Sequence, residues 1–312
     1  AYQANNVAIT GAGTLDGNGA AEFAGWRQKQ EADVNRLRQM GIDGVPVHER
    51  VFGPGHFLRL GMVVFFGCRN VLFEGFRIID SPFWSVHTVG CWNVTARGLR
   101  ITSHNPNNDG VDPESSVDVL VEKCTFDTGD DCIAIKSGRD QDGWRVGQAS
   151  ENIVVRDCDF TSLKAALCLG SEMSGGIRNV YLRDVRVDKT YTGIYFKTNL
   201  DRGGSIRHVR IRDVPIGEAE IFIHFTTAYQ GYRGGQHPPD VGDVRIENVT
   251  CERAATGIRI VGVPQSPIRD VQLRDVTLAQ TPAPHEIRHV QGFAARDVRI
   301  NGQPLALPST IA

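Results

Sequence analysis

The stretch NVYLRDVRVDKTYTGIYFKT, residues 179–198, contains three features that recur along the chain. It begins with Asn179 and an alternating apolar strand, places the apolar Val185 six residues later, and starts a second alternating strand at Gly193. Short β-branched segments with period-two alternation, separated by Gly, Asn and Asp, are typical of strands and turns. The stretch therefore predicts two short strands joined by a turn, and its recurrence decides the fold.

Repeats of this pattern cover most of the chain. An Asn, Asp or His followed by Val or Ile begins a strand at Asn6, Asn70, Asn93, Asp118, Asn152, Asn179, His208, Asp243, Asp270 and Asp297. From residue 70 onward these starts follow one another at 23 to 35 residues. Fourteen residues after five of them a second strand begins, at Trp84, Cys132, Ala166, Gly193 and Gly257. Repeats of this length are typical of solenoids and propellers.

The sixth position after each start distinguishes between these two architectures. It is apolar in eight repeats, at Phe76, Leu99, Cys124, Cys158, Val185, Val214, Val249 and Val276. If each repeat is one coil, these side chains form an inward ladder, with neighbouring coils about 4.8 Å apart like paired strands. A propeller blade needs four antiparallel strands, which do not fit in coils of this length. The sequence therefore predicts an all-β parallel β-helix, a solenoid with a stacked apolar interior.

Two cysteines, Cys124 and Cys158, occupy equivalent inward positions on neighbouring coils. Free cysteine is among the most buried residue types, so we predict two buried thiols that act as small apolar side chains. A disulfide between them is the alternative.

Two segments interrupt the repeats. Residues 22–48 contain a helix-like run from about 25 to 40, which we expect to end at Gly41 and Gly44. We interpret 22–48 as an insertion on one side of a single β-helix domain spanning 1–312, and the Gly- and Tyr-rich segment 227–240 as a second loop. Because the chain opens within what reads as a strand, AYQANNVAITG, we expect the full protein to have a further N-terminal segment.

Composition narrows the functional classes. The chain has 312 residues, with 41% hydrophobic and 22% charged residues, and its formal net charge is −2. It has no basic footprint for nucleic acid and no apolar run long enough to cross a membrane. Seven cysteines without a CxxC spacing argue against zinc and thioredoxin chemistry. We expect a monomer without metal or cofactor.

Carboxylates gather at the turns of two successive coils. Asp109 lies in NNDGVD on one coil, and Asp130 and Asp131 lie in GDDC at the matching edge of the next. From the strand spacing we expect separations of about 5–9 Å, and inverting glycosidases need two carboxylates about 6.5–9.5 Å apart. Crowding of like charges would keep one acid protonated while the others activate water. We predict these three as catalytic residues. For Asp112, Asp118 and Asp127 we expect only the local backbone hydrogen bonds usual at turns.

Cationic and aromatic side chains lie on the following coils. The 34-residue step from 118 to 152 stacks Lys164 over Asp130, and the next step places Lys197 over Lys136 and Gly170 at the far end of the same strand column. These lysines suit an anionic sugar, although a lone lysine on a solenoid is often simply solvated. We also predict Asn107, Tyr195 and Arg202 as substrate-binding residues, with Tyr191 as a further stacking candidate.

Four motifs in this order, NNDGVD, TGDDCIAIKSG, GSEMSGG and KTNLDRGG, resemble glycoside hydrolase family 28, the polygalacturonase family. RVFGPGHFLR, SPFWSVH and GAGTLDGNG resemble its bacterial members. The resemblance implies a right-handed parallel β-helix that hydrolyses α-linked galacturonic-acid polymers with inversion and without a metal. It implies that Asp130 is the general acid, that Asp109 and Asp131 activate water, and that Lys197 holds a substrate carboxylate. An acidic poly- or oligosaccharide partner and a secreted or periplasmic location are expected.

Two positions depart from the family pattern. Lys164 stands where the family has the His of Gly-His-Gly, and Tyr195 stands in place of the Arg of Arg-Ile-Lys. Loss of a bidentate Arg weakens the binding of a planar carboxylate. A rhamnogalacturonan or another substituted pectin is therefore an alternative substrate.

Two other classes of protein remain open. A calcium-dependent pectate lyase would need an Arg base beside the acids, and no Arg stacks there in the repeat. A non-catalytic carbohydrate-binding solenoid is the other alternative. If 22–48 and 227–240 close one end of the groove, exo action is expected.

Overall fold

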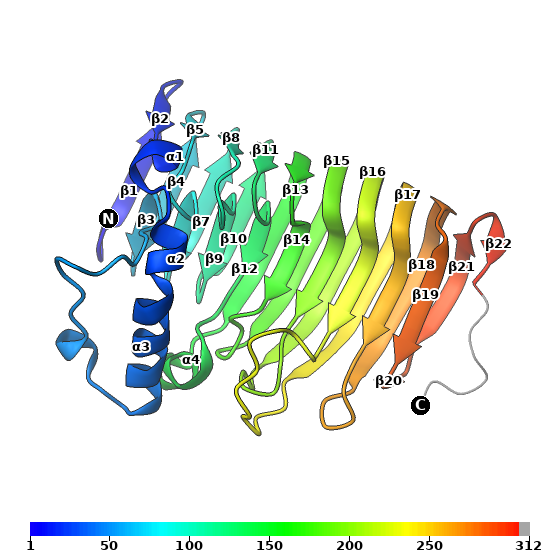
Figure 1. Cartoon of the computed structure of the whole chain (residues 1–312). Helices are drawn as coiled ribbons and strands as arrows, with labels where there is room; N and C mark the ends of the chain where they lie inside the picture. Colours follow the sequence, from blue (N-terminus) through cyan, green and yellow to red (C-terminus); the bar gives the residue numbers. More distant parts are fainter. Residues whose placement is uncertain (306–312) are drawn as a thin grey trace.

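The computed structural model describes residues 1–305, so the last seven residues of the predicted 1–312 domain lie outside the described part. Strands stack side by side from the N-terminal to the C-terminal end of one elongated coil (Figure 1). The predicted all-β parallel solenoid is confirmed: the pairings between described strands are parallel except for an antiparallel pairing of the last two.

The earlier strands are short, and the later ones run continuously through the bends of the coil. The first group is β1 (Asn5–Thr10), β2 (Thr14–Asp16), β3 (Val63–Phe66), β4 (Arg69–Glu74), β5 (Arg77–Ile79), β6 (Val86–Val89), β7 (Trp92–Arg97), β8 (Arg100–Ser103), β9 (Val111–Glu114), β10 (Val117–Glu122), β11 (Thr125–Thr128) and β12 (Ile133–Ile135). The second group is β13 (Ser150–Ser162), β14 (Ala165–Gly170), β15 (Ile177–Lys197), β16 (Ser205–Thr226), β17 (Asp240–Val261), β18 (Ile268–Gln280), β19 (Ala283–Arg288), β20 (Val290–Gln291), β21 (Ala294–Ile300) and β22 (Gln303–Pro304). The helices are α1 (Gly19–Glu22), α2 (Trp26–Lys29), α3 (Glu31–Ile42), the 3-10 turn η1 (Val47–Glu49) and α4 (Asp140–Val146).

Backbone conformation explains why the repeats begin with Asn, Asp or His. The starting residue adopts a left-handed conformation, as in Asn70 with φ 54° and Asp118 with φ 58°, and Asn and Asp tolerate this region better than other non-Gly residues. Their side chains also bond from coil to coil: Asn93 donates to Asn70, and Asn70 donates to Asn6, both at 2.8 Å. Each coil therefore turns at the same point, which keeps the strands in register.

The inward ladder is confirmed, since all eight side chains six residues after a start are buried. In-register pairing places Cys158 beside Val185 and Val214 beside Val249. Cys124 and Cys158 are buried free thiols, as predicted. The core is thus a continuous apolar column that fixes the position of every turn at its edge.

One predicted repeat start is wrong. The pairing of β18 with β21 places Val298 beside Val276, so Asp297 aligns with Asp275 and not with the start at Asp270. Both Asp275 and Asp297 have left-handed φ values of 52° and 54°. Both positions have an Asp in the same backbone conformation, so the sequence pattern alone does not distinguish them.

The N-terminal insertion differs in detail from the prediction. The expected helix forms as α2 and α3, and α3 continues through Gly41 to Ile42. A Cβ at Gly41 would lie 2.8 Å from the carboxylate of Asp142, so this glycine permits close packing against α4 and does not end the helix. The part without strands, 17–62, is also longer than the expected 22–48.

Segments outside the repeats account for the longest coils. α4 lies between β12 and β13, and a loop spanning 227–239 lies between β16 and β17, near α4 and α3 in Figure 1. Arg38 of α3 binds Asp140 at 2.6 Å and Asp201 at 2.9 Å, and Arg50 binds Asp142 at 2.6 Å. The insertion is therefore bound to the side of the solenoid by partly buried ion pairs. None of the helices in residues 1–305 has the length and apolarity needed to cross a bilayer.

Candidate active site

A groove of about 660 Å³ crosses the outer surface of the middle coils. Its walls combine carboxylates, amides, cations and aromatic rings from segments that range from α2 to β19. The principal lining side chains are Arg27, Asn107, Asp130, Asp131, Lys164, Tyr191, Tyr195, Lys197, His224, Tyr229, Arg259 and Arg288.

Three acids meet at one edge of this groove. Asp109 precedes β9, and Asp130 and Asp131 precede β12; the Gly110 N–H donates to the Asp131 carbonyl at 2.9 Å, which holds the two turns level. One carboxylate oxygen from each acid lies within 4.8 Å of the others, closer than the 5–9 Å expected. Asp109 and Asp131 are 3% and 1% exposed, whereas Asp130 is more accessible. These distances do not test the catalytic roles predicted for the three acids, which stay predictions.

Two lysines pair with two of the three acids. Lys197 Nζ lies 2.9 Å from Asp131 Oδ2, and Lys136 Nζ lies 3.5 Å from Asp109 Oδ2. Within residues 1–305, no lysine, arginine or histidine forms an ion pair with Asp130. Two of the acids therefore have an internal counterion, and the most accessible one does not.

The hydrogen bonds to the Asp130 carboxylate come from neutral groups instead. Its Oδ1 accepts the Asp131 N–H at 3.0 Å, and its Oδ2 accepts Asn107 Nδ2 at 3.4 Å. Asn107 is held by Arg59, whose Nη2 donates to Asn107 Oδ1 at 2.6 Å. Burial and the neighbouring Asp131 raise the pKa of Asp130, which favours the protonated form. Such a carboxyl can donate a proton, as general acid catalysis requires.

The same three acids have a spacing that a cation could bridge. Ammonium groups of Lys136 and Lys197 already lie against two of them. Although burial lowers the pKa of Lys197, Asp131 and other neighbouring groups together raise it well above its ordinary value, so the ammonium stays charged. The protein itself supplies cations at this cluster, and a resident metal is not needed to balance Asp109 and Asp131.

Most of the predicted substrate-binding residues meet in the groove. Register places Lys164 level with Asp130, because Ser162 pairs with Thr128; its Nζ lies 5.7 Å from the centre of the Tyr191 ring. The Tyr195 ring stacks on His224 with centroids 4.8 Å apart, and Lys197 Nζ lies 5.2 Å from the same ring. Asn107, Lys164, Tyr195 and Lys197 are thus brought together around the acids.

Arg202 does not reach the groove, so the prediction that it binds substrate directly is not supported. Its side chain is 1% exposed, and its guanidinium binds Asp140 at 2.6 Å and the Ser171 carbonyl at 3.0 Å. Burial of a cation requires such partners, and here they lie beneath the surface. Arg202 instead anchors α4 to the coil.

Three further predictions concerned turn aspartates and were wrong. We expected local backbone bonds, but Asp118 accepts from Asn152 at 2.9 Å and Asp127 lies 2.7 Å from His104. Asp112 is fully buried and lies 3.3 Å from Lys136 Nζ. In each case the partner comes from a neighbouring coil, which lies about one strand spacing away.

The sequence reading missed several groove residues. His224 and Arg259 follow Tyr195 in the same column, so the repeat spacing could have identified them. Burial lowers the pKa of His224 to about 4, so it presents a neutral imidazole at neutral pH. Arg27 comes from α2, and no feature of the repeat could have placed it in the groove.

Comparisons with known proteins agree on one family. A family model described as Glycosyl hydrolases family 28 matches residues 59–296. A hyperthermoactive exopolygalacturonase from Thermotoga maritima has a similar structure, with a TM-score of 0.92 and 38% identity over 97% of this chain and 71% of that one. A probable polygalacturonase of Vitis vinifera is 28% identical over 67% of this chain and 44% of its own length. An endo-polygalacturonase of Pectobacterium parmentieri is 25% identical over 81% and 58%, respectively. The chain spans about half the length of these two curated relatives.

Proposed function

The chain belongs to glycoside hydrolase family 28, and from this premise we propose that it hydrolyses polygalacturonic acid with inversion at the anomeric carbon. The observation that carries the proposal is the difference in ion pairing among the three acids. Asp109 and Asp131 each form an ion pair with a buried ammonium, while Asp130 is partly exposed and forms none. This division suits one protonated acid and two ionised carboxylates.

The proposed reaction assigns each acid a step. Asp130 donates its proton to the glycosidic oxygen as the bond from that oxygen to the anomeric carbon breaks. A water molecule attacks the anomeric carbon from the opposite face and loses a proton to Asp109 or Asp131. The new hydroxyl has the inverted configuration; the base then releases its proton to solvent, and Asp130 regains one from solvent.

The cations of the groove favour a chain of acidic sugars. Lys164, Arg27, Arg259 and Arg288 all line it, and Lys197 presents its ammonium beside Tyr195. We propose that Lys164 and Lys197 bind substrate carboxylates, that Asn107 positions Asp130, and that Tyr195 contacts a sugar ring. The similarity to polygalacturonases favours polygalacturonate over rhamnogalacturonan, a lyase reaction or simple carbohydrate binding.

The insertion supports exo action, which we include in the proposal. α2 brings Arg27 to the groove beside Asn107 and Asp130. Behind it, Arg38 of α3 donates to the Gly231 carbonyl at 3.4 Å, and Arg233 binds Asn35. The helices and the 227–239 loop thus form one continuous wall. The similar structure from Thermotoga maritima is also an exopolygalacturonase.

Three properties of the whole protein remain part of the proposal. We propose a monomeric enzyme with one β-helix domain. A polysaccharide substrate outside the cytoplasm suits a secreted or periplasmic location.

Product analysis tests the function. We expect early, exclusive release of short products from polygalacturonate and from a panel of pectic oligosaccharides, with inverted anomers in NMR spectra taken immediately after cleavage. A ladder of mid-length products would contradict exo action. An unsaturated product with ultraviolet absorbance, together with loss of activity on chelation, would contradict hydrolysis and indicate a lyase reaction.

A further inference from the structure

Lys136 lies beneath the acids and outside the groove lining. It follows β12 directly, and its side chain is 4% exposed. Its Nζ lies 3.5 Å from Asp109 Oδ2 and 3.3 Å from Asp112 Oδ1, and 4.6 Å from the centre of the Trp84 ring. A buried ammonium between two carboxylates is held in a defined place, since each contact compensates for its lost hydration.

Asp112 cannot contact a substrate, because it is 0% exposed. Neither of its carboxylate oxygens has a hydrogen-bond partner in residues 1–305, and Lys136 is its nearest cation. His87 faces Asp112 from β6 but already binds Glu114 at 2.8 Å. A buried carboxylate with a single ion-pair partner is expensive to maintain, which indicates a role through that partner.

Three further acids lie around Asp109. Asp131 is bound by Lys197 at 2.9 Å. Glu172 lies 3.9 Å from Lys136, and although burial would raise its pKa, Lys136 together with Arg139 and Arg202 holds it at about 2. Asp130 adds a further negative charge when ionised. Among residues 1–305, Lys136 is thus the one cation that forms an ion pair with Asp109.

On the basis of the proposed function, we propose that Lys136 is a positioning residue: its ammonium, fixed from beneath by Asp112, favours the ionised form of Asp109 and holds that carboxylate in place to activate water. Lys136 touches neither the substrate nor the reacting atoms. It acts through Asp109, and Asp112 fixes the ammonium from the other side.

The two members of the pair affect Asp109 with opposite signs. The pKa of Asp109 is raised well above its ordinary value, because burial and the charge of Asp112 raise it and Lys136 offsets only part of this effect. Removing the ammonium therefore makes Asp109 harder to ionise, while removing the charge of Asp112 makes it easier. Since the base must be ionised, the acidic limb of the kcat/KM profile should move in opposite directions in the two variants.

The experiment compares Lys136→Met, Asp112→Asn and the double variant in the full chain. We expect Lys136→Met to move the acidic limb up by about one pH unit or more, with a fall in kcat and little change in KM. Asp112→Asn should move the limb down, and the double variant should lie between them. Lys189→Met is the matched control, because Lys189 pairs with Glu218 away from the groove at 3.3 Å.

A second readout separates this inference from the proposed function. NMR titration of ¹³C-labelled aspartate carboxyls, assigned with Asp109→Asn, follows Asp109 directly without substrate. If wild type hydrolyses no polygalacturonate but the Asp109 titration still moves as expected, the function fails and the ion-pair inference holds. If wild type is active and neither the titration nor the acidic limb moves in Lys136→Met or Asp112→Asn, the inference is overturned. Should Lys136→Met not fold, Asp112→Asn alone decides by the direction of its shift.

Discussion

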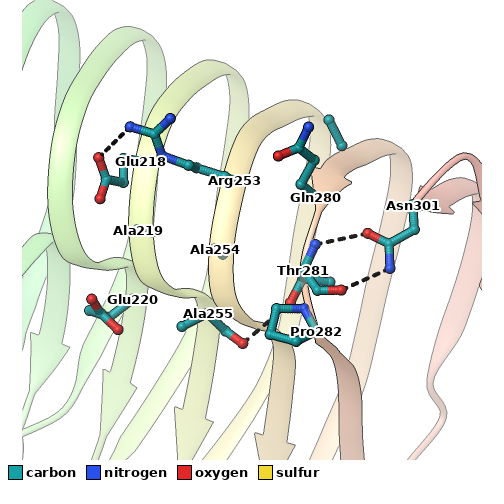
Figure 2. A pocket seen from close by; sticks show the side chains of 11 residues that line it. Glu218, Ala219, Glu220, Arg253, Ala254, Ala255, Gln280, Thr281, Pro282 and Asn301 are labelled. Atoms are coloured by element: carbon teal, nitrogen blue, oxygen red, sulfur yellow. Dashed lines mark hydrogen bonds and ion pairs between the residues drawn. The ribbon is translucent and has the colours of Figure 1, made fainter.

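Two hollows of nearly equal size lie along the same strands, yet they differ in how their charged side chains are paired. The groove measures about 660 Å³, and a second hollow of about 680 Å³ is formed where β16, β17 and β18 curve (Figure 2). In the second hollow Glu218 binds Arg253 at 2.8 Å, and Asn301 forms two hydrogen bonds of 2.8 Å with the Thr281 backbone. At the edge of the groove, three crowded acids meet the buried ammoniums of Lys136 and Lys197.

This comparison indicates that the balance between acidic and cationic side chains, and not the size of the hollow, distinguishes the candidate active site. Hydrogen bonds from Arg253 and Lys189 lower the pKa of Glu218, so it is an ordinary ionised carboxylate in water. Burial raises the pKa of Asp130, and this carboxyl forms no ion pair with a cation of residues 1–305. Carboxyls with perturbed pKa values in a cleft are typical of catalytic sites. The same fold thus forms both hollows, but of Glu218 and Asp130 only Asp130 has a raised pKa, which suits proton donation.

The largest expected effect tests the acid of the groove. Asp130→Asn keeps the shape of the side chain but cannot donate a proton to the leaving oxygen, so we expect hydrolysis of polygalacturonate to fall about 100- to 10,000-fold. Reducing-sugar release measures the rate, and binding of a short oligogalacturonide measures whether the groove is intact.

Asp118→Asn is the matched control for this substitution, because Asp118 is an exposed turn residue at the start of the same coil. It should retain wild-type activity. A loss of less than tenfold in Asp130→Asn would remove Asp130 from the role of general acid.

An intermediate effect is expected at Lys164, which is exposed at the rim of the groove. Lys164→Met should raise KM for polygalacturonate about two- to fivefold with kcat nearly unchanged, because an exposed ion pair contributes modestly and is screened by salt. The difference from wild type should shrink as the salt concentration rises. An unchanged KM at low salt would indicate a merely solvated lysine, and Lys189→Met beside the second hollow controls for loss of a surface charge.

The sequence predicted the coil and the edge where the acids meet, because both depend on spacing. Asn70, Asp118 and their counterparts mark the left-handed turns, and in-register pairing carries each turn to the same edge. The spacing could not show the direction of long side chains or the docking of helices. Lys136 closes the motif TGDDCIAIK, but only the structure shows that its ammonium turns down to Asp109 and Asp112.

Errors at Gly41 and Arg202 have the same physical origin. Both residues lie in segments outside the repeat or at its border, and both contact α4 through Asp142 and Asp140. α4 interrupts the coil between β12 and β13, so its contacts follow no period of the chain. Local patterns predict turns and strands well, but contacts between insertions depend on the assembled fold.

The smallest expected effect tests the second hollow. Glu218→Gln removes a charge from a site of similar size to the groove, but its partners Arg253 and Lys189 are exposed and remain hydrated by water. We therefore expect kcat/KM for polygalacturonate within about twofold of wild type and no measurable change in the thermal unfolding midpoint. Steady-state kinetics and calorimetry on the purified full chain make the comparison. A substantial loss of activity would show that the second hollow takes part in binding the polymer, and charge balance would then no longer separate the two regions.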